Sequence, residues 1–234
     1  MIHALFFDFN GVIIDDEPLQ LKAYQEAFEP EGVTLTEKDY YDALGMDDRT
    51  FVRAIFERAG KPLDETVMGA VIGRKSDLHR LKLEDELPLF PGIVTFVKHA
   101  ARRYQLGISS MAQRVEIDDV LRRARLDSAF TVIVSAEDAT ACKPDPCCYR
   151  RALELLNEKR QGAGQPPIKP DDCLVIEDSP PGIVSGRAAG MRTLGVTNTV
   201  SEEALRAAGA EVVTRSLADW NVEAVHHIYD RDEG

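Results

Sequence analysis

Short apolar runs alternate with longer amphipathic stretches along most of the chain. Such short runs, apolar throughout, are typical of strands that are buried on both faces of a parallel sheet. We expect six of them, at residues 3–7, 105–109, 131–135, 173–176, 193–197 and 211–213. The amphipathic stretches predict helices at about 92–104, 113–125, 146–159, 181–189, 201–208 and 218–229. This alternation predicts an α/β fold with an open, doubly wound parallel sheet.

The segment between the first two expected strands departs from this alternation, because its apolar positions have helical spacing and no strand is expected there. Phe51, Ile55 and Phe56 fall on one face of a helix. Asp47 or Asp48 is suited to cap the start of that helix, since a carboxylate accepts hydrogen bonds from free backbone N–H groups. The segment is therefore expected to be all-helical.

This insert has a predictable place in the molecule. At roughly 70 residues it is too long for a loop between a strand and a helix. We therefore expect a Rossmann-like α/β core formed by residues 1–15 and 88–234 and a helical cap domain formed by residues 16–87. Ligands of open α/β sheets bind beyond the carboxyl ends of the strands. A domain inserted there would lie over the ligand site as a lid.

The composition narrows the classes of protein. Hydrophobic residues make up 44% and charged residues 29%, as in soluble globular proteins. No apolar run approaches the ~20 residues of a membrane helix, and Asp8 interrupts the only early one, so neither a span nor a secretory signal is expected. The net charge of −12 disfavours nonspecific binding to nucleic acid or anionic membranes. An anionic ligand would need a local reversal of this charge.

The cysteines and histidines give no sign of a metal site of their own. The four cysteines lack the spacing of a disulfide framework or a zinc site, which favours reduced thiols in a cytoplasmic protein. The five histidines are scattered, and each, His79 included, is expected to be a surface or packing residue.

Polar side chains follow four of the expected strands where each strand ends. They are Asp8 after the first strand, Ser109 and Ser110 after the second, Lys143 after the third, and Glu177 and Asp178 after the fourth. Each alone has an ordinary explanation as a turn residue, a helix cap or a solvated lysine. Because the carboxyl ends of parallel strands meet at one edge of the sheet, their coincidence favours a functional site.

These residue types together suit phosphoryl transfer. An aspartate such as Asp8 can act as a covalent nucleophile and form an acyl phosphate. Carboxylates such as those of Glu177 and Asp178 hold Mg²⁺, which prefers oxygen ligands. Lys143 and a hydroxyl group would then bind the remaining phosphoryl oxygens.

Several segments carry a resemblance to a known family. They are Asp8-Phe9-Asn10-Gly11-Val12, Asp16-Glu17-Pro18-Leu19, Lys143-Pro144-Asp145-Pro146, Glu177-Asp178-Ser179-Pro180-Pro181-Gly182-Ile183 and Ala188-Ala189-Gly190-Met191. In order and spacing they resemble the haloacid dehalogenase-like hydrolase superfamily, within it the phosphatase and β-phosphoglucomutase-like branch with a small helical cap. The resemblance covers essentially the whole chain. It implies a Rossmann-like core, dependence on Mg²⁺ and an aspartyl-phosphate intermediate.

The resemblance also implies roles for single residues. By matched position Asp8 is the nucleophile, and Lys143 binds both the phosphate and the nucleophile. Ser109 is the phosphate-binding hydroxyl, with Ser110 as the alternative.

The same resemblance implies the metal site. Asp8 and Asp178 ligate Mg²⁺, the backbone carbonyl of Asn10 can add a ligand, and Glu177 acts directly or through a metal-bound water. With Mg²⁺ and Lys143 in place, the local charge at the phosphate becomes positive although the chain is acidic. Without Mg²⁺ the site should repel phosphate.

One catalytic position departs from the family pattern. Phosphatases of this family carry a second aspartate two residues after the nucleophile, as general acid and base, and here that residue is Asn10. An amide cannot exchange the catalytic proton, and such help is typically worth 10²–10⁴-fold in rate. Esters with poor leaving groups and hydrolysis of the phosphoenzyme should suffer most. The asparagine fits an introduced substitution, a natural enzyme of weak or altered activity, or a phosphate-binding protein without catalysis.

The cap residues bear on the branch and the substrate. The phosphonate-cleaving branch needs a cap lysine where this chain has Asp48, and the sugar phosphomutase branch has a histidine where this chain has Gln20. Haloacid dehalogenases work without a metal and do not need the acidic pair that this chain retains. Arg49 and Lys75 are candidate substrate contacts, each with a solvated helix charge as the alternative.

We therefore expect an Mg²⁺-dependent phosphatase-like hydrolase acting on a small phosphorylated metabolite, in particular a sugar phosphate, with no nucleic-acid or membrane partner. The alternatives are a phosphomutase, or a catalytically silent binding or regulatory protein with the same fold. The sequence makes no prediction of the oligomeric state.

Overall fold

The computed structural model describes residues 1–84, 87–220 and 222–229. Its centre is a six-stranded parallel sheet with the strand order β3-β2-β1-β4-β5-β6. The strands are β1 (Ala4–Phe7), β2 (Gln105–Ser109), β3 (Val132–Val134), β4 (Cys173–Glu177), β5 (Arg192–Val196) and β6 (Val212–Thr214). All six predicted strands are present, and the doubly wound α/β fold is confirmed.

Alternate residues of the central strand face opposite layers, as the strand period of two requires. Leu5 and Phe7 join the cluster that includes α5 (Ile93–Ala100), α6 (Arg114–Ala124) and α10 (Val222–Tyr229), whereas Ala4 and Phe6 join the cluster of α7 (Cys147–Gly162). The helices α8 (Pro180–Ala188) and α9 (Glu202–Ala207) complete the core, with 3₁₀ turns at Ala136–Asp138, Pro170–Asp172 and Leu217–Asp219.

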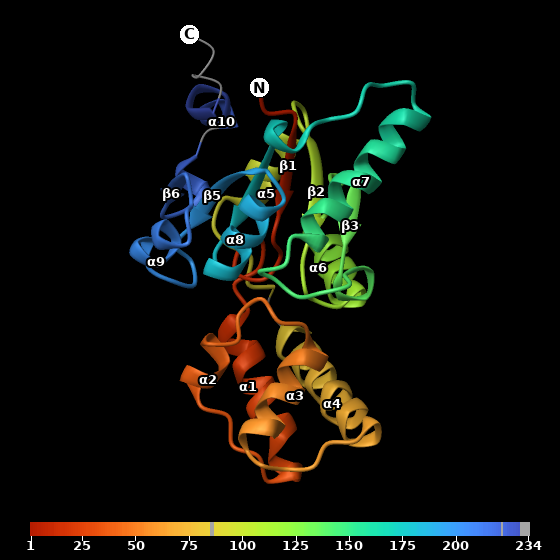
Figure 1. The fold of residues 1–234 in the computed structure, drawn as a ribbon, viewed down its shortest axis with the longest axis vertical. Helices are drawn as coiled ribbons and strands as arrows, with labels where there is room; N and C mark the ends of the chain where they lie inside the picture. Colours follow the sequence, from red (N-terminus) through yellow and green to blue (C-terminus); the bar gives the residue numbers. More distant parts are fainter. Residues whose placement is uncertain (85–86, 221, 230–234) are drawn as a thin grey trace.

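Four helices between β1 and β2 form a separate layer below the sheet in Figure 1. They are α1 (Glu17–Phe28), α2 (Glu37–Tyr41), α3 (Asp48–Arg58) and α4 (Glu65–Glu84), with a 3₁₀ turn at Glu29–Glu31. They enclose their own apolar cluster, to which Phe51, Ile55 and Phe56 all belong, as predicted. Asp47 caps α3, since its side chain accepts a hydrogen bond from the backbone N–H of Thr50 at 2.7 Å.

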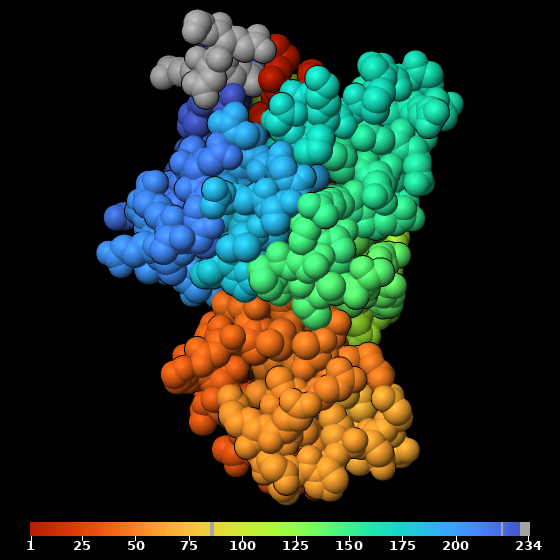
Figure 2. Space-filling view, in the orientation of Figure 1, coloured from red at the N-terminus to blue at the C-terminus, as the bar shows by residue number. Residues whose placement is uncertain are grey.

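The cap lies at the end of the molecule opposite the N-terminus and α10, against the green and blue segments of the core (Figures 1 and 2). The carboxyl ends of the strands face it, so the helical insert covers the predicted ligand edge. The boundaries predicted at residues 16 and 87 stay predictions. Within the described parts of the chain, no helix is long and apolar enough to cross a membrane.

Candidate active site

The pairing of β1 with β4 brings the predicted carboxylates together. Phe7 lies opposite Ile176 in the register, so Asp8, the residue after β1, lies beside Glu177, the last residue of β4. The backbone N–H of Asp8 continues the ladder to the carbonyl of Ile176 at 3.0 Å. Carboxylate oxygens of Asp8, Glu177 and Asp178 all lie within 4.8 Å of one another. The sheet therefore gathers three acids from two strands at one point.

Lys143 supplies the cation at this point. Its Nζ lies 3.0 Å from Oδ1 of Asp8 and 2.6 Å from Oε1 of Glu177, and it donates to the backbone carbonyl of Ser109 at 3.2 Å. Burial lowers the pKa of Lys143, but the carboxylates of Asp8 and Glu177 outweigh burial and hold it above its ordinary value. Lys143 is therefore charged and can neutralise an anion bound beside Asp8.

Two hydroxyl groups that were not among the predicted site residues hold the carboxylate of Glu177. The hydroxyl of Tyr149 donates to Oε1 of Glu177 at 2.7 Å, and that of Ser179 donates to Oε2 at 3.1 Å. A Cβ added to Gly182 would lie 1.9–2.0 Å from the Glu177 carboxyl group. The glycine of the Pro180-Pro181-Gly182 turn is therefore required for the close approach of α8 to this carboxylate.

Asp178 is fixed from a different side. Gly11 has a φ of +74°, and an added Cβ there would lie 2.0 Å from Oδ2 of Asp178 and 2.8 Å from the hydroxyl of Thr199. Burial, followed by the neighbouring carboxylate of Glu177, raises the pKa of Asp178 well above its usual range. Burial also raises the pKa of Asp8 to about 6, although Lys143 opposes the change.

These observations fit a divalent cation. Three carboxylates, two of them fully buried, face one lysine, so the group carries excess negative charge, and burial together with the neighbouring carboxylates raises the pKa of Asp8 and Asp178. Oδ1 of Asp8 is buried, and its 3.0 Å contact with Lys143 is an ion pair without hydrogen-bond geometry. An all-oxygen donor set of this kind suits Mg²⁺.

The site opens into a cavity between core and cap. The core contributes Asp8, Asn10, Ser110, Lys143 and Asp178 to its wall, and the cap contributes acidic, aromatic and small apolar side chains and one lysine. Of the two predicted serines, Ser110 lines the cavity, whereas Ser109 is fully buried and lies outside its wall. The structure therefore places Ser110, the alternative choice, where a hydroxyl could reach a ligand.

A family model described as haloacid dehalogenase-like hydrolase matches residues 5–196, which is most of the chain. This chain belongs to the haloacid dehalogenase-like hydrolase family. It is 28% identical over 229 residues to a phosphorylated carbohydrates phosphatase of Thermotoga maritima, covering 94% of this chain and 98% of the relative. It is 30% identical over 207 residues to the protein CbbY of Rhodobacter capsulatus, covering 82% and 84%. Its fold resembles the β-phosphoglucomutase structure from Clostridium difficile, with a TM-score of 0.85, 22% identity and 98% coverage of both chains.

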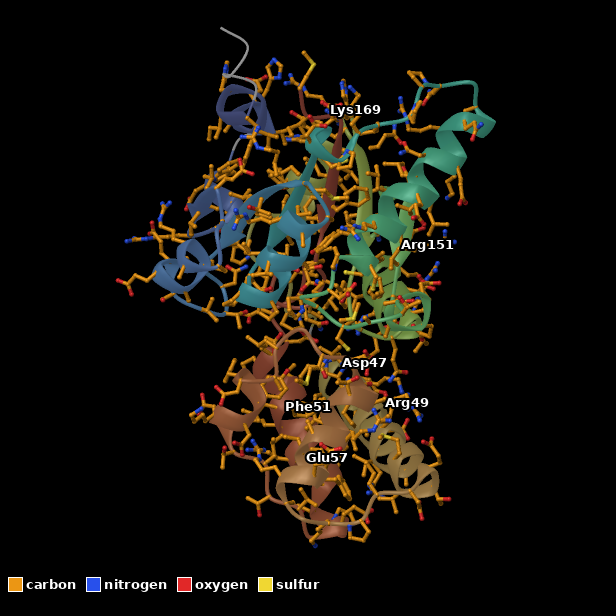
Figure 3. All side chains as sticks on the ribbon, in the orientation of Figure 1. Asp47, Arg49, Phe51, Glu57, Arg151 and Lys169 are labelled. Atoms are coloured by element: carbon orange, nitrogen blue, oxygen red, sulfur yellow. The ribbon has the colours of Figure 1, made fainter. Side chains whose placement is uncertain are left out.

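The two candidate cap contacts of this hydrolase differ in position. Lys75 lines the cavity and is buried, and its Nζ lies 3.3 Å from Oδ1 of Asp48 and 3.2 Å from Oε1 of Glu116. Because Glu116 belongs to α6 and Asp48 to α3, Lys75 ties the cap to the core. Arg49 lies outside the cavity wall, half exposed on the cap (Figure 3), and pairs with Glu65 at 2.6 Å.

Two buried acids of the cap entry were not among the predicted site residues. Glu17 lines the cavity and accepts a hydrogen bond at Oε2 from the hydroxyl of Tyr40 at 2.6 Å. Burial, followed by the charge of Asp16, raises the pKa of Glu17 from 4.5 to about 7. Asp16 itself is completely buried and contacts both Asn10 and His79. In the sequence, only the segment Asp16-Glu17-Pro18-Leu19, which resembles the family, signals this pair.

Proposed function

We propose that this hydrolase is an Mg²⁺-dependent phosphoric monoester hydrolase acting on a small phosphorylated metabolite, in particular a sugar phosphate, through an aspartyl phosphate on Asp8. The observation that carries the proposal is the position of Asp8. Its carboxylate lines the cavity, 3.0 Å from the charged Lys143 and within 4.8 Å of two further carboxylates.

The chain's own residues divide the work of phosphoryl transfer. The carboxylate of Asp8 attacks phosphorus and displaces the ester oxygen, and water later releases phosphate from the aspartyl phosphate. Lys143 balances charge on the phosphoryl oxygens and on Asp8, and Ser110, which lines the same cavity, donates its hydroxyl hydrogen. Asp8, Asp178 and the backbone carbonyl of Asn10 would hold Mg²⁺, with Glu177 acting directly or through a water. The ion would supply positive charge to the phosphoryl group.

The cap side of the cavity supports a neutral leaving group. The cap contributes the acids Glu17 and Asp48 and one lysine, the core adds Glu116 beside them, and both Asp48 and Glu116 already engage the ammonium group of Lys75. A second phosphate would therefore meet an excess of negative charge. Carboxylates and tyrosine hydroxyls suit a polyhydroxylated group, and the cap side of the wall also carries the rings of Tyr24, Tyr40 and Phe51. This supports sugar or sugar-alcohol monophosphates, and the name of the Thermotoga relative agrees.

A phosphate-release screen with millimolar Mg²⁺ tests the proposal. The panel contains sugar monophosphates, sugar bisphosphates, phosphoglycolate and p-nitrophenyl phosphate, with an excess of chelator as the metal control. We expect release from one or more monophosphates, loss of release in chelator and loss in Asp8→Ala. Asp77→Ala removes an exposed cap carboxylate outside the cavity and serves as the matched control.

Two outcomes would reject the proposal. One is no release from any panel member together with ligand affinities that Asp8→Ala leaves unchanged, which points to a binding protein. The other is conversion of one sugar monophosphate into its positional isomer without net release of phosphate, which points to a phosphomutase.

A further inference from the structure

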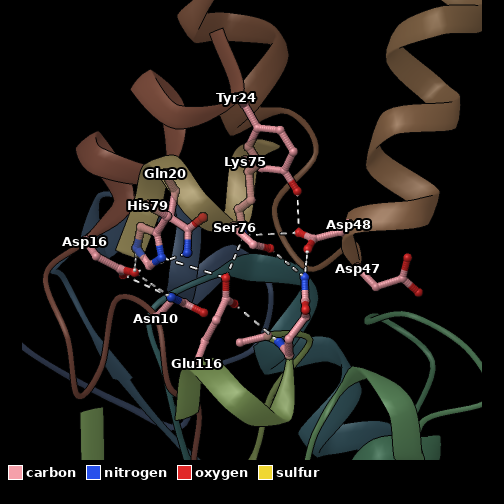
Figure 4. A network of polar contacts seen from close by, with 12 residues as sticks. Asn10, Asp16, Gln20, Tyr24, Asp47, Asp48, Lys75, Ser76, His79 and Glu116 are labelled. Atoms are coloured by element: carbon pink, nitrogen blue, oxygen red, sulfur yellow. Dashed lines mark hydrogen bonds and ion pairs between the residues drawn. The ribbon is translucent and has the colours of Figure 1, made fainter. Parts of the chain in front are cut away.

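The side-chain amide of Asn10, which lines the cavity, contacts the buried carboxylate of Asp16 (Figure 4). Its Nδ2 lies 3.0 Å from Oδ1 and 2.9 Å from Oδ2 of Asp16, so both carboxylate oxygens are within hydrogen-bond distance. A carboxylate accepts hydrogen bonds and donates none when ionised. The nitrogen of the amide must therefore face Asp16, and its oxygen must face away from it.

Asp16 is surrounded by further donors. His79 Nε2 lies 2.8 Å from Oδ2, and Gln20 Nε2 donates to the same oxygen at 3.2 Å. Asp16 has no exposed surface and does not line the cavity, whereas Asn10 does. The carboxylate is thus enclosed by side chains from the cap entry, the cap helix α4 and the core. Charge-assisted hydrogen bonds of this kind are the stronger ones in proteins.

Further charged groups surround this contact where the core meets the cap. Nδ1 of His79 lies 3.7 Å from Oε1 of Glu116, so the imidazole bridges two carboxylates. Glu17 follows Asp16 in the chain and lines the cavity. A carboxylate is therefore present one side chain behind the position at which the family's phosphatases place their acid and base.

We propose that Asn10 and Asp16 form one functional unit in which amide and carboxylate have exchanged places. The amide of Asn10 lines the cavity, and the carboxylate lies behind it at Asp16. Asp16 is a positioning residue: it holds the amide nitrogen of Asn10, so that Asn10 presents only its Oδ1 to the cavity. That oxygen can accept a hydrogen bond from the water that attacks the aspartyl phosphate, and so orient it; the proton of this water leaves with the released phosphate. No proton passes through the amide. The inference rests on the proposed function, because it assigns Asn10 a place beside the reacting phosphate.

The unit makes the effect of substitution at one position depend on the other. Asn10→Asp alone would set two carboxylates about 3 Å apart, and like charges at that distance oppose double ionisation. Asn10→Asp combined with Asp16→Asn keeps the same atoms in contact and restores a donor–acceptor pair, with the carboxylate now at the cavity. The double variant should therefore gain general acid–base catalysis, which Asn10→Asp alone supplies poorly.

Four proteins test the inference: the natural chain, Asn10→Asp, Asp16→Asn and the double variant. The measurements are kcat and KM for the best substrate of the panel with Mg²⁺, and the thermal unfolding midpoint without substrate. We expect the double variant to exceed the natural chain at least 10²-fold in kcat, within the usual worth of general acid–base help. Asn10→Asp should gain less than about tenfold and unfold at a lower temperature, and Asp16→Asn should lose kcat with little change in KM.

The neighbouring Asp15 is exposed and provides the matched control, because Asp15→Asn removes a carboxylate one residue away without touching Asn10. Combined with Asn10→Asp it should give no rescue. If Asn10→Asp alone reaches the rate of the double variant within about threefold, or if Asp15→Asn rescues equally, the unit does not exist. Turnover without coupling between positions 10 and 16 rejects this inference alone. No turnover in any of the four, with coupled unfolding midpoints, rejects the proposed function and the catalytic part of the inference.

Discussion

Glu17 provides a quantitative test of how the cavity wall is built. Its side chain is only 9% exposed at the start of α1, and the hydroxyl of Tyr40 donates to it at 2.6 Å. Burial raises the pKa of Glu17 from 4.5 to about 7, with the charge of Asp16 acting in the same direction. The folded protein therefore favours the protonated form of Glu17, and ionisation of this carboxyl group lowers the stability of the fold. Glu17→Gln removes that charge and leaves the tyrosine an acceptor.

The size and sign of the effect follow from the two pKa values. A difference of about 2.5 units at about 1.36 kcal/mol per unit gives roughly 3 kcal/mol. Because the folded pKa of Glu17 lies above the unfolded value, the folded state binds the proton more tightly. The stability from this group is thus fully present below pH 4.5 and is lost as the pH rises to about 7. Glu17→Gln should therefore be more stable than the natural chain by about 3 kcal/mol at pH 8 and by about 1 kcal/mol at pH 5.

Urea unfolding in chelator at pH 5 and pH 8 measures this difference. Glu29→Gln is the matched control, since Glu29 is an exposed carboxylate directly after the same helix, and its effect should be small at both pH values. Equal effects of Glu17→Gln at pH 5 and pH 8 would refute the reasoning. A stabilised Glu17→Gln with reduced affinity for sugar monophosphates would show that the buried carboxylate is retained for binding, at the expense of stability.

Two further substitutions test the contacts around the site. Gly182→Ala places a Cβ within 2.0 Å of the Glu177 carboxyl group and should weaken Mg²⁺ binding by about 10–100-fold in calorimetric titration, whereas Gly69→Ala, with open space around its Cβ, should not. An unchanged Mg²⁺ affinity in Gly182→Ala would remove Glu177 from the metal site. Lys75→Met leaves two partly buried carboxylates without their buried cation and should lower the free energy of unfolding by about 3–5 kcal/mol. A loss below about 1 kcal/mol in thermal or urea unfolding would show that Lys75 does not hold cap and core together.

The sheet and the positions of the main site residues could be predicted from sequence because both depend on local pattern. Strands buried on both faces appear as short apolar runs, and the residue after each run falls at the same edge of a parallel sheet. Asp8, Lys143, Glu177 and Asp178 were found in this way, and the structure brings them together. The cap was expected for a similar reason, since a long helical segment between two strands has to pack outside the sheet.

The sequence by itself determined the fold class, the family and the edge of the sheet at which the charged groups gather. Only the tertiary structure decided which of two adjacent serines lines the cavity, because neighbouring side chains at a strand end point in opposite directions. It also separated Lys75, which faces the cavity, from Arg49, which pairs with Glu65 at the cap surface. The contact between Asp16 and His79 joins residues 63 positions apart. Such a pairing arises only when α4 packs beside the cap entry, and no local pattern in the chain records it.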